Sequence, residues 1–466
     1  MHLSRGQANP AKTTVRRWPR LVLIGLGTSV VPLDSAVNIA FPDITGSFGL
    51  PVEMIQWVVI CYVLTHASLM LAFGRLGDVF GHVPIFRLGL WWNGTVFLCC
   101  AAAPSYDWLL FCRFLQGIGA AAILSCAPAL VTSLFPEEHR ARALAAFTMM
   151  FALGSAAGPL LGGVLVQNWG WPGVFWFRAP IALTAAAFLA GFPASRRTHA
   201  RESIDVVGAV LLTLGIGAVL MVLNELQHLQ GHALPAAGFT AVALASLVWF
   251  VHRERRITYP IVDVDLFGVG GFAVVNSASV LLSLTSFSVL LFAPYYLVRY
   301  TGFALPTAGA VLAASFCGSI AASPFAGRAI ERLPAYPVLA FGAVLNGAGL
   351  FLIGSWEIGT STAVIFTPLV LQGLGVGLFQ VAYMELVIGT LPPGQRGVAG
   401  SLAMLTRTLG IVTGASLLTL VFHTFQVTPA ASGEDFLFAF RATFRLAGTV
   451  SAISGIVAGL LISRHR

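Results

Sequence analysis

The chain has 466 residues, of which 57% are hydrophobic and 9% are charged, with a formal net charge of +8. An ordinary soluble domain carries roughly one quarter charged residues, so this composition excludes a soluble globular protein. Apolar segments of about 20 residues, the length that spans a bilayer, recur from end to end and leave no room for a large soluble domain. We therefore expect the chain to lie in a lipid bilayer.

A sliding hydropathy window predicts about fourteen membrane-spanning helices and hence an all-α integral membrane protein. In chain order they lie at 20–42, 53–73, 84–103, 107–134, 142–166, 173–193, 204–224, 235–251, 271–298, 306–326, 338–355, 362–390, 398–424 and 438–463.

The arginines predict the orientation of these helices. Basic residues stay on the cytoplasmic side of short loops, and the arginines gather in the loops that lie inside if the N-terminus is inside, with Arg299 as an exception. We therefore expect the cell (inner) membrane, with both termini cytoplasmic. The positive charge then serves orientation, and no nucleic-acid partner is expected. The first segment lacks a small-residue cleavage site, so we interpret it as a retained helix.

Asp34 lies about two-thirds of the way along the first apolar segment. An ionised aspartate near the middle of a bilayer costs at least ~2.5 kcal/mol, so such residues usually face a cavity or a partner. Burial favours the protonated carboxyl, whereas a cationic substrate or a neighbouring arginine favours the carboxylate, and exchange requires this competition. We expect Asp34 to bind a coupling proton. The alternative is an aspartate that only braces the first helix, together with Asn38 one turn away.

The chain contains an internal duplication. GRLGD at 74–78 recurs as GRAIE at 327–331, and QGIG at 116–119 recurs as QGLG at 372–375, at offsets of 253 and 256 residues. Each copy holds about six helices, and parallel halves of this kind place a substrate site between them near the membrane midplane. We therefore expect a basic tail at 1–19, an N-terminal six-helix bundle at 20–193, a two-helix insertion at 194–270 and a C-terminal six-helix bundle at 271–466.

Four motifs resemble those of the 14-helix drug:H+ antiporter-2 family within the major facilitator superfamily. They are LDSAVNIAFP at 33–42, GRLGDVFG at 74–81, RFLQG at 113–117 and GSAAGPLLGG at 154–163. Together with the two-helix insertion, they make a match over nearly the whole chain. The resemblance implies the major facilitator fold and multidrug efflux in exchange for protons.

Arg113 and Gln116 lie on roughly the same face of the fourth predicted helix. In similar transporters the arginine at this place is associated with proton movement, and a fixed positive charge biases the protonation of a nearby acid. We therefore expect Asp34, Arg113 and Gln116 to form the proton-coupling site. The alternative for Arg113 is a side chain that extends to the outer headgroups.

The segment 74–81 should form a tight cytoplasmic loop in which Asp78 accepts bonds from helix N-terminal amides or pairs with a basic loop. The resemblance implies a gating loop that holds the halves in an outward-open state. His82 and Val83 stand where two basic residues are usual, which weakens the charge network expected there. A simple turn with a positive anchor is the alternative. The gating residues are then Gly74, Arg75, Asp78 and Gly81.

Glycines that recur every four residues line one face of the fifth predicted helix, where another backbone can approach closely. A proline among them removes a backbone hydrogen bond and can bend the helix. We predict a tight seam that limits leak, and only the resemblance links it to export. The residues of this antiporter motif are Gly154, Gly158, Pro159, Gly162 and Gly163.

Other polar or aromatic side chains inside predicted spans are candidates for the substrate path from helix facing alone. They are Asn38, Trp57, Tyr62, His66, Gln380, Tyr383 and Glu385. His66 is either a titrating group or a simple hydrogen-bonding residue. Glu385 is either an interfacial residue or a second acidic site. Arg178 stands where similar chains usually carry asparagine. We expect it at the outer surface, although the difference leaves anionic substrates open.

Other classes of function lack the residues they need. Lys12 is the only lysine and has no glycine-rich loop around it, which excludes an ATP-driven pump within this polypeptide. No nucleophile–base pair, metal-ligand spacing or charged filter ring stands out. The six cysteines lie in predicted spans and suit apolar packing. We therefore expect no enzyme, metal site, cofactor or channel.

The sequence thus predicts a proton-coupled antiporter that exports small hydrophobic or amphipathic compounds by alternating access. Its partners are a small-molecule substrate, protons and the lipid bilayer, and we expect a monomer. Two alternatives remain, an exporter of one specific endogenous metabolite or lipid and a non-transporting membrane sensor on the same scaffold. A sensor would bind its ligand without coupled proton movement.

Overall fold

The computed structural model describes residues 18–134, 137–191, 205–225, 233–257, 268, 271–390, 396–426 and 433–464. Within these ranges every regular element is helical and no strand occurs. Twelve described stretches are long and apolar enough to span a membrane, and shorter apolar stretches lie at Gln56–Ala67 and Val210–Val219. These two belong to the second and seventh expected spans, so the prediction of an all-α membrane protein with about fourteen helices is confirmed.

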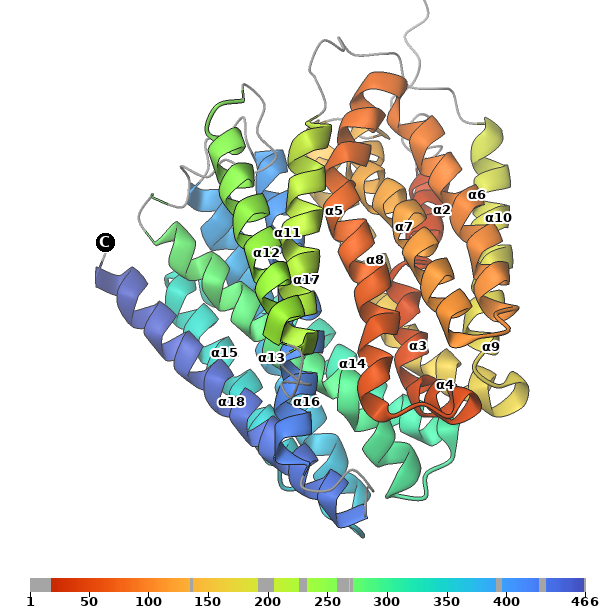
Figure 1. The fold of residues 1–466 in the computed structure, drawn as a ribbon. Helices are drawn as coiled ribbons and strands as arrows, with labels where there is room; N and C mark the ends of the chain where they lie inside the picture. The colour runs from red at the N-terminus through yellow and green to blue at the C-terminus, as the bar shows by residue number, and fades with distance from the viewer. Residues whose placement is uncertain are drawn as a thin grey trace, which may run out of the picture.

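The helices cross in alternating directions between two faces of the bundle (Figure 1). The first half contains α2 (Trp18–Ser29), α3 (Ala36–Ile39), α4 (Phe41–Phe48), α5 (Gln56–Phe80), α6 (His82–Ala101), α7 (Tyr106–Leu134), α8 (Glu137–Trp169), α9 (Gly173–Trp176) and α10 (Arg178–Phe188).

The second half contains α13 (Phe272–Arg299), α14 (Leu305–Ile330), α15 (Ala335–Ile353), α16 (Thr362–Thr390), α17 (Arg396–Phe425) and α18 (Gly433–Arg464). Between the halves in sequence lie α11 (Val206–Glu225) and α12 (Ala233–Glu254), which pack on each other. Helix α11 also contacts α5 of the first half and α17 of the second (Figure 1). The inserted helices therefore touch both halves.

The duplication is visible in the packing of each half. A Cβ added to Gly89 of α6 would lie 2.9 Å from the carbonyl oxygen of Gly119 in α7. One added to Gly342 of α15 would lie 2.8 Å from the carbonyl oxygen of Gly375 in α16. These pairs are related by the same offsets of 253 and 256 residues as the sequence repeats. The two copies therefore share one close helix contact.

The first span is interrupted at its centre. Helix α2 ends at Ser29, and a short 3-10 helix, η1 (Pro32–Ser35), precedes α3 and α4. Pro32 begins η1 and Pro42 lies in the first turn of α4. Proline has no backbone N–H to continue a helical hydrogen-bond ladder, so the sequence favours these breaks. The interruption places Asp34 in a short turn within the bundle.

This interruption packs against α8 through the predicted glycine face. A Cβ added to Gly158 would overlap the hydroxyl of Ser35, and one added to Gly162 would lie 2.8 Å from the carbonyl oxygen of Ala36. The Ser35 hydroxyl also donates to the backbone carbonyl of Ser155 at 2.9 Å. The close approach expected from the small residues is therefore present, and it fixes the turn that carries Asp34.

The same helix continues the contact into the second half. A Cβ added to Gly163 of α8 would overlap the carbonyl oxygen of Leu305, and one added to Gly309 of α14 would overlap that of Pro159. Helix α8 lies between the first span and α14 (Figure 1). It therefore connects the Asp34 turn to the other half of the molecule.

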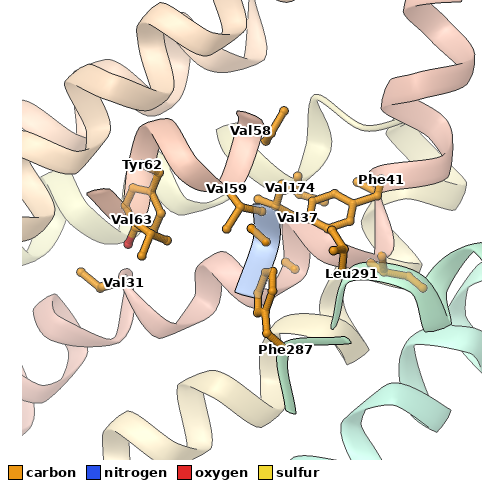
Figure 2. Packing of buried hydrophobic residues seen from close by; sticks show 14 of the residues in the cluster. Val31, Val37, Phe41, Val58, Val59, Tyr62, Val63, Val174, Phe287 and Leu291 are labelled. Carbon is orange, nitrogen blue, oxygen red and sulfur yellow. The ribbon is translucent and has the colours of Figure 1, made fainter. Parts of the chain in front are cut away.

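Apolar side chains of the first span and α5 pack against α13 at the seam between the halves. Figure 2 shows Val37 and Phe41 of the first span and Val59 of α5 near Phe287 and Leu291 of α13. All five are buried, with exposed fractions of 6% or less. These five side chains therefore form a buried apolar contact between the halves.

The segment 74–81 corrects a prediction. It is not a loop, because α5 continues through Phe80 and α6 begins at His82, with Gly81 alone between them. Gly81 has φ 94°, a conformation that favours glycine and turns the chain abruptly. The predicted end of the second span at 73 was too early, because the helix outlasts its apolar stretch. The side chains of Arg75 and Asp78 lie outside the described set, so their gating role stays a prediction.

Replacing Gly163 with alanine should separate α8 from α14, because the new methyl group meets backbone atoms that have no rotamer to change. We expect a loss of about 1–3 kcal/mol in stability, seen as a lower melting temperature of the purified protein. Gly327→Ala is the matched control, since a Cβ there meets nothing within 4 Å. Equal melting temperatures for the two variants would contradict the described seam.

Candidate functional site

The carboxylate of Asp34 is the centre of a buried charged cluster. Arg113 of α7 donates from Nη1 to Oδ1 at 2.7 Å and from Nη2 to Oδ2 at 2.8 Å. Arg178 of α10 donates from Nη1 to Oδ1 at 2.6 Å, and Gln116 of α7 donates from Nε2 to the same oxygen at 3.0 Å. Asp34 thus accepts four hydrogen bonds, an arrangement that suits the ionised acid.

Arg113 is fixed by contacts beyond Asp34. Its Nε donates to the backbone carbonyl of Val58 at 2.8 Å, and its Nη1 also donates to Oε1 of Gln116 at 2.8 Å. Its guanidinium lies 4.4 Å from the ring centroid of Tyr62. Arg113 is only 1% exposed, so it does not extend to the headgroups as the alternative interpretation required. One helix therefore supplies both the arginine and the amide that orient the carboxylate.

Arg178 corrects a second prediction. We expected it at the outer surface, but its side chain is fully buried and contacts Asp34. Its Nε donates to the carbonyl of Val174 one turn earlier at 2.9 Å, and its guanidinium lies 4.5 Å from the ring of Phe97. The sequence indicated that Arg178 is paired, because an arginine inside an apolar segment needs a partner of opposite charge. In the structure that partner is Asp34.

The cluster carries more positive than negative charge. Two guanidinium groups share one carboxylate, which gives a net charge of +1. Among the described residues both ion pairs of Arg113 and Arg178 end on Asp34, and Nη2 of Arg178 is buried with no hydrogen-bond partner. Aromatic faces, including Phe175 at 5.4 Å from Arg178, offset part of the cost. The site therefore has one unused hydrogen-bond donor, Nη2 of Arg178, and one positive charge that Asp34 does not neutralise.

Other candidates in the first half lie near this cluster. Tyr62 and His66 of α5 are buried, with ring centroids 5.0 Å apart, and Nδ1 of His66 has no hydrogen-bond partner among the described residues. Asn38 is buried in α3, one turn beyond Asp34. Trp57 is half-buried near the start of α5. These positions are compatible with a path past Asp34, and their role stays a prediction.

The second half contains a polar network that the sequence did not indicate as a unit. Tyr383 donates to Oδ1 of Asn276 at 2.9 Å and bonds with the Thr406 hydroxyl at 2.8 Å. Separately, Gln372 donates to Oδ1 of Asn346 at 3.0 Å. Because every member is neutral, the network can position helices or bind neutral groups, but it supplies no acid.

The remaining candidates in α16 do not join this network. Gln380 is half-buried, and Glu385 is exposed and forms no ion pair with any described residue. Among the described residues no group of three histidines, cysteines, aspartates or glutamates is arranged to hold a metal ion. Among the described residues, the ion pairs buried within the two halves therefore centre on Asp34, and a further buried carboxylate, Asp205, pairs with Arg253 in the inserted segment.

The duplicated fold does not repeat the charges. At the offset of 253 residues the position of Asp34 corresponds to Phe287, and at 256 residues that of Arg113 corresponds to Leu369. Gln116 is kept as Gln372. Among the described residues, two duplicated helical halves thus form a polytopic membrane protein whose ion cluster lies in the first half.

Comparison with known proteins identifies the family. The family model described as Major Facilitator Superfamily matches residues 23–275 and 275–466, which together cover most of the chain. The chain therefore belongs to the major facilitator superfamily, and the resemblance seen in its sequence motifs is confirmed.

Curated relatives support this membership. The multidrug resistance protein Stp of Mycobacterium tuberculosis (strain ATCC 25618 / H37Rv) is 30% identical over 85% of this chain and 74% of its own. The multidrug efflux pump LfrA of Mycolicibacterium smegmatis is 26% identical over 90% of this chain and 84% of its own. The uncharacterized transporter YebQ of Escherichia coli is 28% identical over 97% of both chains. The protein is therefore a membrane transporter.

Solved structures agree with the fold. A bacterial homolog of the human lysosomal transporter Spinster, in an inward-facing and unoccupied conformation, superposes with a TM-score of 0.69, 16% identity and coverage of 98% of both chains. An auto-inhibited peptide transporter of the POT family superposes with a TM-score of 0.71, 17% identity and coverage of 97% of both chains. At these identities the likeness concerns the fold alone.

Removing the carboxylate should destabilise the protein, because Asp34→Ala leaves two buried guanidinium groups without an anion. We expect a loss of about 3–5 kcal/mol, as for other broken buried pairs, measured as a reduced melting temperature in detergent. Glu357→Gln is the control, because the Glu357–Arg441 ion pair lies at the surface and should contribute at most about 1 kcal/mol. Similar losses of stability in both variants would show that the buried cluster stabilises the protein no more than the surface ion pair does.

Proposed function

We propose that this protein is a proton-coupled antiporter that exports small hydrophobic or amphipathic compounds across the cell (inner) membrane by alternating access. Its termini lie in the cytoplasm, and it works as a monomer with a small-molecule substrate and protons as partners. The observation that carries the proposal is the buried Asp34 carboxylate, held by Arg113 and Gln116 in the interrupted first span. A titratable acid at such a position is the usual coupling element of a transporter.

Proton binding requires a change in this cluster. All four hydrogen bonds reach the carboxylate oxygens, so a proton can bind only when at least one guanidinium moves away. A relative movement of the first span and α7 would separate Asp34 from Arg113. The carboxylate could then take a proton from one side of the membrane and return it when the pair forms again.

Helix α8 supplies a mechanical route for this movement. It contacts the Asp34 turn through Ser155 and Gly158, and it contacts α14 of the second half through Pro159 and Gly163. Rocking of the halves therefore moves the same helix that braces the Asp34 turn. This arrangement supports coupling between the opening of the seam and the state of the carboxylate.

The proposed substrate class follows from the surface of the seam. Buried valine, phenylalanine and tyrosine side chains line the part of the seam in Figure 2, and a surface of this kind suits apolar ring systems. Relatives named for multidrug resistance and multidrug efflux support export of such compounds. Tyr62 and His66 in the first half and Gln380 in the second would provide polar contacts along the path.

Asp34→Asn should abolish substrate-driven proton movement in proteoliposomes, because the amide cannot bind and release the coupling proton. The measurement is the change in internal pH after a substrate gradient is imposed, compared with empty liposomes. Asp43→Asn is the matched control, since Asp43 lies in α4 and accepts from the backbone N–H of Trp171 at 2.8 Å, away from the cluster. Full coupling in Asp34→Asn would refute the proposed role of this residue.

Export in cells should depend on the proton gradient. Expression in a pump-deficient host should lower the accumulation of a transported dye, and an uncoupler should restore accumulation to the level of cells without the protein. Accumulation that stays low in the presence of the uncoupler would rule out proton coupling, whatever the substrate.

A further inference from the structure

We propose that Arg178 binds an anionic group of the transported compound, so that amphipathic organic anions such as aryl carboxylates or sulfonates are preferred over cations. The inference rests on the proposed function, because it names the substrate class for the same central site. It concerns a residue that the sequence analysis expected at the outer surface and that the fold places against Asp34.

The charge balance of the cluster carries the first part of the argument. Arg113 and Arg178 give two positive charges against the single negative charge of Asp34. A cation that enters this centre meets a net repulsion, whereas one negative charge from a ligand makes the cluster neutral. Buried charges are tolerated when they are paired, so an anionic group of the ligand would supply the second negative charge that pairs with the two arginines.

The hydrogen bonds identify the atom that receives this anion. Arg113 uses Nε and both Nη atoms on protein acceptors. Arg178 uses Nε on Val174 and Nη1 on Asp34, while its Nη2 is buried with no partner among the described residues. An unpaired guanidinium nitrogen is a strong donor to a carboxylate or sulfonate oxygen. Arg178, rather than Arg113, therefore has a guanidinium nitrogen that is available to donate a hydrogen bond to a ligand.

The surroundings favour an anion that is attached to an aromatic or apolar body. The rings of Phe97 and Phe175 already lie 4.5 Å and 5.4 Å from the Arg178 guanidinium, so the body of a bound anion would meet aromatic surroundings. Access comes through the Asp34 side, because the Asp34 side chain is 13% exposed while that of Arg178 is fully buried. The ligand therefore reaches Nη2 as the seam opens around Asp34.

This site constrains how exchange works. Because a proton binds Asp34 only after a guanidinium has moved away, the protonated carboxyl and the paired cluster that receives the anion belong to different arrangements of the halves. Exchange of an anion for a proton must then depend on the rocking of the halves, which exposes the sites to the two sides of the membrane in turn.

The test compares two dyes that share one ring system, the anionic dye fluorescein and the cationic dye rhodamine ethyl ester. Binding to purified protein in nanodiscs is measured by fluorescence polarisation, at one pH where fluorescein is ionised and with no proton gradient. We expect the wild-type protein to bind fluorescein at least about tenfold more tightly than the cationic dye. Arg178→Gln should weaken fluorescein binding at least about 30-fold, the lower end for loss of one partner from a buried charge pair. The affinity for the cationic dye should stay equal or rise.

Two further variants keep the test independent of folding. Arg178→Lys retains the charge and should keep the preference for fluorescein, with weaker binding because the ammonium lacks the planar fork. Arg441→Gln removes an arginine of the surface pair with Glu357 and should leave the ratio of the two affinities unchanged. A wild-type protein that does not bind fluorescein, or an Arg178→Gln variant in which the affinity ratio is unchanged, overturns the proposal. Because no gradient is present, failure of proton coupling in proteoliposomes would leave this result unaffected.

Discussion

The buried pairing of one carboxylate with two guanidinium groups is the interaction on which the centre of this transporter depends. Each charge alone would be costly in a helical bundle within a membrane, and the three are tolerated because they lie within hydrogen-bond distance of one another. The pairing also ties together three segments, since Asp34 comes from the interrupted first span, Arg113 from α7 and Arg178 from α10. Any movement among these segments changes the electrostatics of the site.

Close backbone packing transmits that movement. Helix α8 has no room for side chains where it meets the Asp34 turn and, a few residues later, where it meets α14. A glycine face of this kind gives two neighbours a common rigid surface. A rearrangement at the boundary between the halves therefore also moves the charged cluster, although the boundary and the cluster consist of different side chains.

The two halves combine a repeated scaffold with an unrepeated chemistry. The contact of Gly89 with Gly119 recurs as that of Gly342 with Gly375, which shows that the helix packing was duplicated. The ion cluster was not, because Phe287 and Leu369 occupy the positions that correspond to Asp34 and Arg113. The second half instead contributes a neutral network around Tyr383, and both copies contribute apolar side chains to the seam, so the charges of the cluster come from one copy and its apolar surroundings from both.

The sequence by itself determined the membrane setting, the helical class, the duplication and the candidacy of Asp34, because hydrophobic length, repeat spacing and the cost of an intramembrane charge are all local properties. It also placed Arg113 and Gln116 next to each other, since residues three positions apart on a helix lie on the same face. Only the tertiary structure decided that Arg178 contacts Asp34 from 144 residues away and that α5 continues to Phe80. Which buried charges pair with each other depends on which helices pack together, and the spacing of residues along the chain does not determine that packing.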